Sequence, residues 1–255
     1  MIITFLGTGA SPGVPMLACN CKVCRSEDSR NRRLRASILV QNKKFNILVD
    51  TSTDLRQQCL LAGVEDVDAI LYTHHHADHI LGLEELRAFN FIHKKTIPVY
   101  GKEETFKEIR KVFHYIFEEN SGYSGTLSSV VVRPLKGRTF VLGGIPVTPL
   151  DIVHGSLHIL GYRFGNSAYI TDASDIPTST LEKLKGLDVL ILNALRLDLH
   201  PTHINLEQAL ELARLIKPER TILTHMTHQI DYAEISRNLP ENVELAWDGM
   251  RVECA

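Results

Sequence analysis

Four side chains that commonly bind metals fall within six residues of this chain, at His74, His76, Asp78 and His79. They follow the short apolar run 69–72, which has the length and composition of a buried strand. Alternate side chains of an extended segment point the same way, so His74 and His76 can bind one metal. Asp78 and His79 come where the chain turns and can reach a second metal, since imidazole and carboxylate are usual ligands of zinc, iron and manganese. We therefore predict a metal centre here and not a polar loop with chance histidines, because burying four such groups without cations would be costly.

A second cluster consists of three cysteines, Cys19, Cys21 and Cys24. In a reducing compartment this spacing is typical of thiolate ligands for zinc. The fourth ligand must come from elsewhere, and His228 is the best candidate because it stands just after another potential ligand, His225. Three cysteines and one histidine would close the coordination sphere, so this zinc would be structural. The alternative is redox-active or simply buried cysteine.

Three further potential ligands, His154, Asp172 and His225, each stand just beyond a predicted strand. Taken singly, a histidine or aspartate at a strand end is more often a cap or a surface residue. Together with the first cluster they would supply two metals with three ligands each and one bridging carboxylate.

Alternation and breaker residues predict a β-rich chain with interspersed helices. The expected strands are 2–6, 37–40, 45–49, 69–72, 97–100, 130–133, 146–152, 159–164, 168–171, 189–193 and 221–224. The expected helices are 53–62, 83–91, 103–117, 179–185 and 206–216, the last with Asn205 as N-cap and a stop signal at Pro218. The stretch 120–125 is the most loop-like part of the chain and could border a cleft. Two β-rich halves flanked by helices predict an α/β fold in which sheet packs on sheet and helices cover the outer faces.

Bulk composition is that of an ordinary globular protein, with 44% hydrophobic and 23% charged residues in a chain of 255. The net charge of −2 gives no global field to recruit nucleic acid or an anionic membrane. No signal peptide or membrane-spanning run is apparent, and five cysteines without an export signal argue against a disulfide framework. We therefore expect a cytoplasmic protein with one domain over 1–255; a homodimer is compatible with the sequence.

The order and local setting of these candidate ligands resemble the pattern of the metallo-β-lactamase superfamily, and the resemblance covers essentially the whole chain. The Gly-Thr-Gly turn at 7–9 and the Asp-Thr pair at 50–51 match as well. The resemblance implies a four-layer αβ/βα sandwich with two metals along one edge. It implies one metal on His74, His76 and His154. The second metal would lie on Asp78, His79 and His225, with Asp172 bridging the two and Asp50 bracing the histidine loop from behind.

The cysteine insertion near 19–24 narrows the resemblance to PhnP-like phosphodiesterases of the carbon–phosphorus lyase pathway, which carry such a zinc site and open a ribosyl cyclic phosphate. The segments 201–206, 224–229 and 247–250 also look like their pattern. By that resemblance His203 is the general acid, and His203 and Asp78 are the expected catalytic residues. The segment 102–129 matches no motif and could set substrate choice.

The expected function is hydrolysis of a small phosphate ester, cyclic or linear, by a hydroxide shared between two manganese or zinc ions. An imidazole such as His203 can carry a proton near neutral pH for the leaving group. The arginines at 30, 32, 33 and 35 would form a solvated basic face, or else receive substrate phosphates. Five other histidines are expected to be structural or superficial: His75, His93, His114, His158 and His200.

Three rival functions share this ligand set. Transfer-RNA 3′-processing endoribonucleases carry a long arm between the positions of His154 and Asp172, which stand too close here to contain one. Thioester or lactone hydrolysis on the same metals is not excluded. A non-catalytic metal-binding or cofactor-handling protein of the PqqB type is the third.

Overall fold

The computed structural model describes residues 1–118 and 127–254. Its strands are β1 Ile2–Gly7, β2 Ser37–Asn42, β3 Phe45–Val49, β4 Ala69–Leu71, β5 Ile97–Gly101, β6 Val130–Pro134, β7 Phe140–Leu142, β8 Ile145–His154, β9 Leu157–Phe164, β10 Ser167–Ile170, β11 Val189–Asn193, β12 Arg220–Thr224, β13 Val243–Leu245 and β14 Arg251–Glu253. Its α-helices are α1 Leu55–Ala62, α2 Ala77–Ile80, α3 Leu86–His93, α4 Glu103–Val112, α5 His114–Phe117, α6 Thr178–Lys183, α7 Leu206–Ile216 and α8 Tyr232–Ser236, and Ser29–Asn31 and Leu81–Glu85 form 3₁₀ turns.

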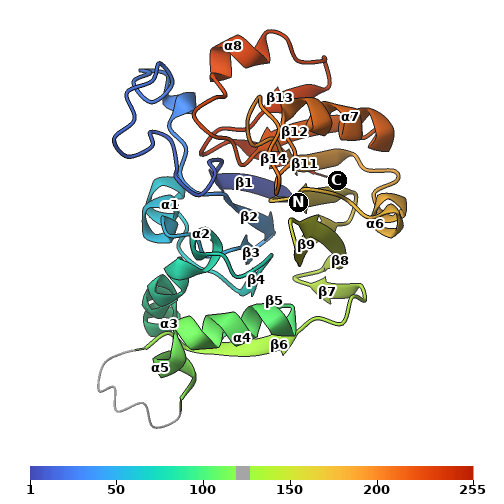
Figure 1. Cartoon of the computed structure of the whole chain (residues 1–255). Helices are drawn as coiled ribbons and strands as arrows, with labels where there is room; N and C mark the ends of the chain where they lie inside the picture. The colour runs from blue at the N-terminus through green and yellow to red at the C-terminus, as the bar shows by residue number, and fades with distance from the viewer. Residues whose placement is uncertain (119–126, 255) are drawn as a thin grey trace.

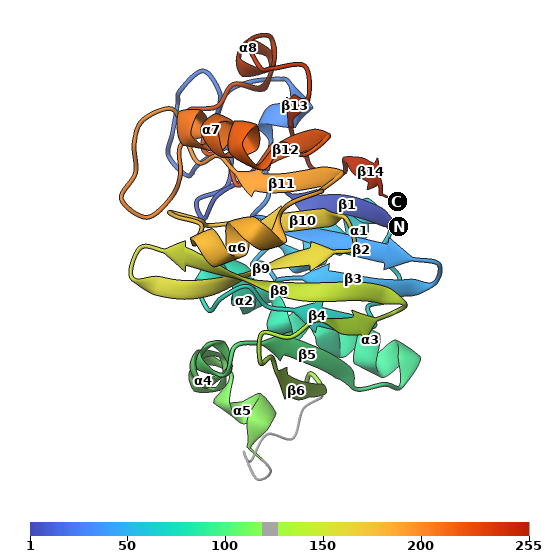
Figure 2. The same cartoon turned by 90° about the vertical axis from the view of Figure 1, so that its right-hand side faces the viewer.

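The strands form two seven-stranded mixed sheets, each from one half of the chain except that β14 returns to the first. The order is β14-β1-β2-β3-β4-β5-β6 in one sheet and β13-β12-β11-β10-β9-β8-β7 in the other. The two sheets lie face to face, with α1 to α5 outside the first and α6 to α8 outside the second (Figure 1). Both chain termini lie beside β1 and β14 (Figure 2).

Three apolar clusters correspond to the three interfaces between these layers. The central cluster joins residues of both sheets, such as Val49 and Leu71 with Tyr169 and Ile191. A second cluster packs the outer face of the second sheet against α6, α7 and α8, and a third packs the outer face of the first sheet against α1, α3 and α4. This is the four-layer αβ/βα sandwich that the sequence predicted.

Every strand expected from the sequence is present, with ends that differ by a few residues. The patterns did not predict β7, β13 and β14, nor the short helices α2 and α8. The helix expected over 103–117 is interrupted at Phe113, whose backbone leaves the helical region (φ −113°, ψ 38°), so that α4 and α5 are separate. The loop-like stretch 120–125 lies outside the described residues. In the part of the chain that is described, no helix has both the length and the apolar character needed to span a bilayer.

Candidate metal centre

The predicted ligands gather where strands of both sheets end. The histidine loop follows β4, His154 is the last residue of β8, and Asp172 and His225 come just after β10 and β12. The ends of these strands lie along one edge of the sandwich, so residues placed there can meet although they come from both sheets. The structure thus brings all seven predicted active-site ligands together.

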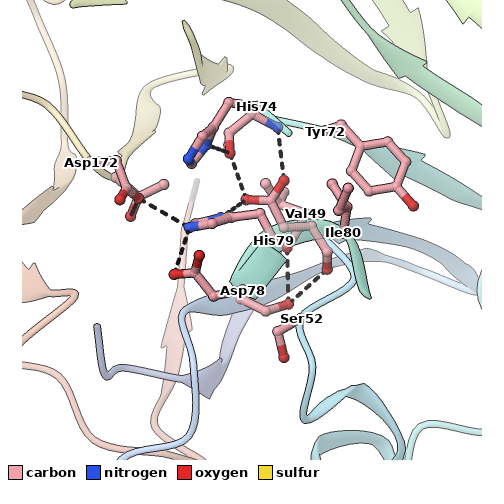
Figure 3. Close-up of polar contacts among 12 residues, drawn as sticks. Val49, Ser52, Tyr72, His74, Asp78, His79, Ile80 and Asp172 are labelled. Carbon is pink, nitrogen blue, oxygen red and sulfur yellow. Dashed lines mark hydrogen bonds and ion pairs between the residues drawn. The ribbon is translucent and has the colours of Figure 1, made fainter. Parts of the chain in front are cut away.

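Two groups of donors can be distinguished by distance. The ligand atoms of His74, His76 and His154 lie within 4.8 Å of one another, and so do those of Asp78, His79 and His225. Asp172 stands between the groups, because its ligand atom lies within 4.8 Å of those of His74 and His79 and also of those of His154 and His203. Its Oδ2 is 3.3 Å from His79 Nε2 and its Oδ1 is 3.1 Å from His225 Nε2. Figure 3 shows the His79 ring directed toward both Asp78 and Asp172.

Asp50 braces the histidine loop from behind. Its Oδ2 is 2.8 Å from His79 Nδ1 and accepts the Thr73 hydroxyl at 2.7 Å, while its Oδ1 accepts the Thr73 backbone N–H at 2.8 Å. Asp50 is completely buried, yet these contacts satisfy its carboxylate. With Nδ1 of His79 held by Asp50, Nε2 is directed into the site, which is how ligating histidines are usually oriented.

The backbone at three of these positions is strained. Asp50, Asp172 and His225 adopt φ values of 62°, 58° and 56°, in the left-handed region that non-glycine residues rarely occupy. Each stands one or two residues beyond the end of a strand, where this conformation turns its side chain toward the common edge. Strain of this kind persists where the surrounding structure enforces it, often at functional sites.

The unpaired nitrogens and the charges of this site suit divalent cations. Among the described residues, Nε2 of His74, of His79 and of His225 are buried and make no hydrogen bond of acceptable geometry, although those of His79 and His225 lie 3.3 and 3.1 Å from the Asp172 carboxylate. Burial lowers the pKa of His74 well below its ordinary value, so its ring is neutral, as a metal ligand must be. Burial opposes ionisation of Asp172, but the imidazoles of His225 and His79 outweigh it and hold the pKa of this carboxyl well below its usual range. Imidazole and carboxylate are the donor set that zinc, manganese and iron accept. Burial opposes the charge of His79, but the carboxylates of Asp78, Asp172 and Asp50 outweigh it and raise the pKa of this ring well above its ordinary value, so a bound cation would take the place of that proton.

His203 lies over this centre. Its Nδ1 is 3.7 Å from Asp172 Oδ1, and its ring centroid is 4.7 Å from that of His154 and 5.2 Å from that of His225. Burial and the neighbouring His225 lower the pKa of His203 to about 3. The predicted general acid is therefore beside the site, but it is neutral at pH 7 before substrate arrives.

The cysteine cluster also forms in space. The thiols of Cys19, Cys21 and Cys24 lie 3.1, 3.4 and 3.6 Å from Nδ1 of His228, and the four ligand atoms fall within 4.8 Å of one another. The backbone N–H of Cys24 bonds the Cys21 sulfur and lowers the pKa of that thiol to about 6. These three thiols and one imidazole form a compact tetrad of zinc-type donors, separate from the first centre.

Two residues that touch the site went unnoticed in the sequence. The Ser11 hydroxyl donates to Asp78 Oδ2 at 2.7 Å, and the Thr202 carbonyl oxygen is 2.8 Å from His154 Nδ1. The only sequence signal was their position, Ser11 just after the Gly-Thr-Gly turn and Thr202 next to His203.

The arginines at 30–35 were predicted to form a solvated basic face or to receive substrate phosphates, and Arg33 does neither. Its side chain is 2% exposed, and its guanidinium donates to the backbone oxygens of Thr227 and Ile230 at 3.0 and 2.7 Å. It is therefore neither a solvated surface charge nor a group that can receive substrate. Arg30 and Arg35 are paired with Asp28 and Asp54.

Residues 45–226 match the family described as Beta-lactamase superfamily domain. The match includes every ligand of the first centre. The chain belongs to the metallo-β-lactamase superfamily. A solved structure of a diphosphatase of the PhnP family is 40% identical, has a TM-score of 0.93, and is covered over 98% of its length by the whole of this chain. This metallo-β-lactamase-type hydrolase domain is thus PhnP-like, as its cysteine insertion predicted.

Two curated relatives also match this chain in sequence. Octanoyltransferase of Porphyromonas gingivalis is 39% identical over 250 residues, which are 96% of this chain and 50% of that protein, so the chain spans about half the length of this relative. Ribonuclease Z of Methanopyrus kandleri is 33% identical over 104 residues, which are 40% of this chain and 32% of that protein.

Proposed function

We propose that this chain is a dinuclear metal-dependent phosphodiesterase that hydrolyses a small phosphate ester, cyclic or linear. The observation that carries the proposal is the position of Asp172, whose ligand atom lies within 4.8 Å of those of His74 and His154 from the first group and of His79 from the second. One metal would be held by His74, His76 and His154. The other would be held by Asp78, His79 and His225, with Asp172 shared. When bound, two such ions lower the pKa of a water and neutralise charge on a phosphoryl oxygen.

The chain's own residues would orient the substrate and handle the proton. Ser11 and Thr202 fix the orientation of Asp78 and His154 through their hydrogen bonds. A phosphodiester bound beside His203 would raise the imidazole pKa, because a nearby negative charge favours the protonated ring. His203 would then protonate the leaving oxygen. The three cysteines with His228 would hold one structural zinc, since three thiolates and one imidazole would fill its four coordination positions.

Two observations support phosphorus over carbonyl chemistry. The full-length relative of known structure is a diphosphatase, which cleaves a phosphoanhydride, and the ribonuclease Z relative cleaves a phosphodiester. A phosphoanhydride is therefore the second candidate bond. A transfer-RNA substrate is less well supported, because between His154 and Asp172 the chain forms only β9, β10 and tight turns, with no arm.

The first experiment measures hydrolysis of a chromogenic phosphodiester, with manganese and with zinc, by the full chain and by Asp172→Ala. We expect metal-dependent turnover that falls by more than about 100-fold in the variant, together with loss of bound metal, because a shared ligand is removed. Turnover of a thioester but of no phosphodiester or phosphoanhydride by the metal-loaded chain would refute the proposal.

A second experiment tests His203. In His203→Ala we expect a loss of about 10²–10⁴-fold for an ester with an alkyl leaving group, and a much smaller loss for one that releases an acidic phenol. The phenolate needs no proton to leave, so equal losses for both esters would exclude general acid catalysis by this residue.

A further inference from the structure

Helices α1 and α3 cover the outer face of the first sheet, and the side that they turn away from the sheet carries large apolar side chains (Figure 1). Leu60 on α1 is 63% exposed, and Phe91 and Ile92 on α3 are 74% and 68% exposed. Exposed apolar side chains that gather in one patch often mark an interaction site, because each keeps apolar area in contact with water. We call this surface the α1–α3 face.

A groove of about 220 Å³ lies between the two helices on this face. Most of its lining is apolar and comes from Leu55, Cys59, Leu60, Val64, Ala88 and Phe89. Ile92 stands one helical turn after Ala88, so it extends the same side of α3. The α1–α3 face thus combines a depression with protruding apolar side chains, which is a shape on which a second protein surface can pack closely.

Two opposite charges also line this groove, Arg56 on α1 and Glu85 immediately before α3. In the part of the chain that the structure describes, neither forms an ion pair or a side-chain hydrogen bond, whereas their neighbours Arg87 and Glu84 pair at 3.8 Å. One cation and one anion give no net field that would favour a polyanion or an anionic membrane. They do make the face complementary to itself, because a two-fold axis through the groove would bring each Arg56 to the partner's Glu85.

We propose that the α1–α3 face is the interface of a homodimer, in which a second copy of this chain packs its own α1 and α3 on the groove. A two-fold interface uses the same patch on both copies, so Leu60, Phe91 and Ile92 would each contribute twice to its apolar centre. Arg56 and Glu85 would form two ion pairs between the copies. None of these residues is a metal ligand, so the inference is independent of the proposed reaction.

The first test measures the mass of the full chain by sedimentation equilibrium at micromolar concentration. We expect twice the mass of one chain. Leu60→Asp places a carboxylate in the apolar centre and should weaken dimerisation about 100-fold or more. Leu215→Asp is the matched control: Leu215 is also 63% exposed, but it lies on α7 outside the second sheet, and this variant should dimerise like the wild-type chain.

A charge exchange tests the pairing itself. Arg56→Glu and Glu85→Arg each place like charges opposite one another, so each variant alone should dimerise about tenfold or more weakly than the wild-type chain. An equimolar mixture of the two variants should dimerise more tightly than either alone, because both contacts of the mixed dimer again join opposite charges. A wild-type chain that stays monomeric would overturn the proposal. So would equal dimerisation of Leu60→Asp and Leu215→Asp, or a mixture that associates no better than its separate components.

Discussion

Asp50 lies behind His79 and joins this ring to the start of the histidine loop, through contacts of 2.8 Å to His79 Nδ1 and 2.7 Å to the Thr73 hydroxyl. In Asp50→Asn one acceptor becomes an NH₂ group, which would face either the Thr73 N–H or the His79 ring N–H. We expect metal affinity to fall about 10–100-fold, the usual effect of losing a partner behind a ligand. Competition with a chelator measures this.

The matched control for that prediction is Asp66→Asn, which removes a carboxylate from a partly exposed pair with Lys95. It should leave metal affinity unchanged. Unchanged affinity in Asp50→Asn as well would mean that the loop keeps its geometry without the carboxylate.

The metal ligands could be predicted from residue type and spacing, but the residues that form hydrogen bonds to those ligands could not. Histidine, cysteine and aspartate at these spacings are informative in themselves. Ser11 and Thr202 are ordinary residues, and they matter only because the fold brings them to Asp78 and His154, 67 and 48 positions away. Arg33 was misjudged for the same reason: its acceptors on the Thr227–Ile230 loop are nearly 200 positions distant.

Helix α7 begins where the loop that carries His203 ends, so its N-terminus affects both stability and the site. Asn205 Oδ1 accepts the Gln208 N–H at 3.0 Å, and Gln208 Oε1 accepts the Asn205 N–H at 2.9 Å. The Asn205 amide also donates to the Leu197 carbonyl at 2.9 Å. Asn205→Ala should lower the free energy of unfolding by about 1 kcal/mol, measured in urea.

The same variant should reduce turnover while its metal content stays normal, because the loop that positions His203 loses its anchor to Leu197. Asn238→Ala, at an exposed position after α8, is the control and should change neither stability nor turnover. Loss of stability with unaltered turnover would show that α7 is capped independently of the site.

The cysteine insertion is the second element with a clear test. His228 belongs to the loop that follows β12 and carries His225, so a zinc at the tetrad would tie the segment 19–24 to this loop. Cys21→Ser should remove one zinc per chain and lower the free energy of unfolding by about 3 kcal/mol or more. Cys254→Ala, which alters a buried thiol outside the tetrad, should keep the full zinc content. Full zinc content in Cys21→Ser would contradict the assignment.

For the molecule as a whole, the interior was more predictable than the edges. Interior strands such as β3 and β11 carry apolar runs, at 47–49 and 189–192, and their pairing into two packed sheets follows from that pattern. The three strands that the sequence did not predict, β7, β13 and β14, are three-residue strands at sheet edges. Each is too short to show a hydrophobic pattern in the sequence, and β14 pairs with β1 from the opposite end of the chain. Only the assembled fold defines them.

The last prediction concerns Asp248, which joins the C-terminal part of the chain to the N-terminal part. Its carboxylate accepts the Thr8 hydroxyl and the Leu34 N–H, each at 2.7 Å. Burial nevertheless raises its pKa from 3.8 to about 7. A carboxyl with a raised pKa in the folded state contributes stability that is fully present below its ordinary pKa and is lost as pH rises through the folded value.

The wild-type chain should therefore lose stability relative to Asp248→Asn as pH rises from about 4 to 7, the interval between the ordinary and the folded pKa of this carboxyl. The full shift would convert to about 4 kcal/mol. We expect about half of that, because the side chain keeps some contact with water. Urea unfolding of both chains across this range measures the difference in their free energies of unfolding. The slope of this difference against pH does not depend on the pH-independent free energy lost when a carboxylate oxygen is replaced by an amide NH₂ group. A difference that stays flat with pH would mean that Asp248 remains ionised, stabilised by its two donors and by the charge of the buried Arg33 guanidinium.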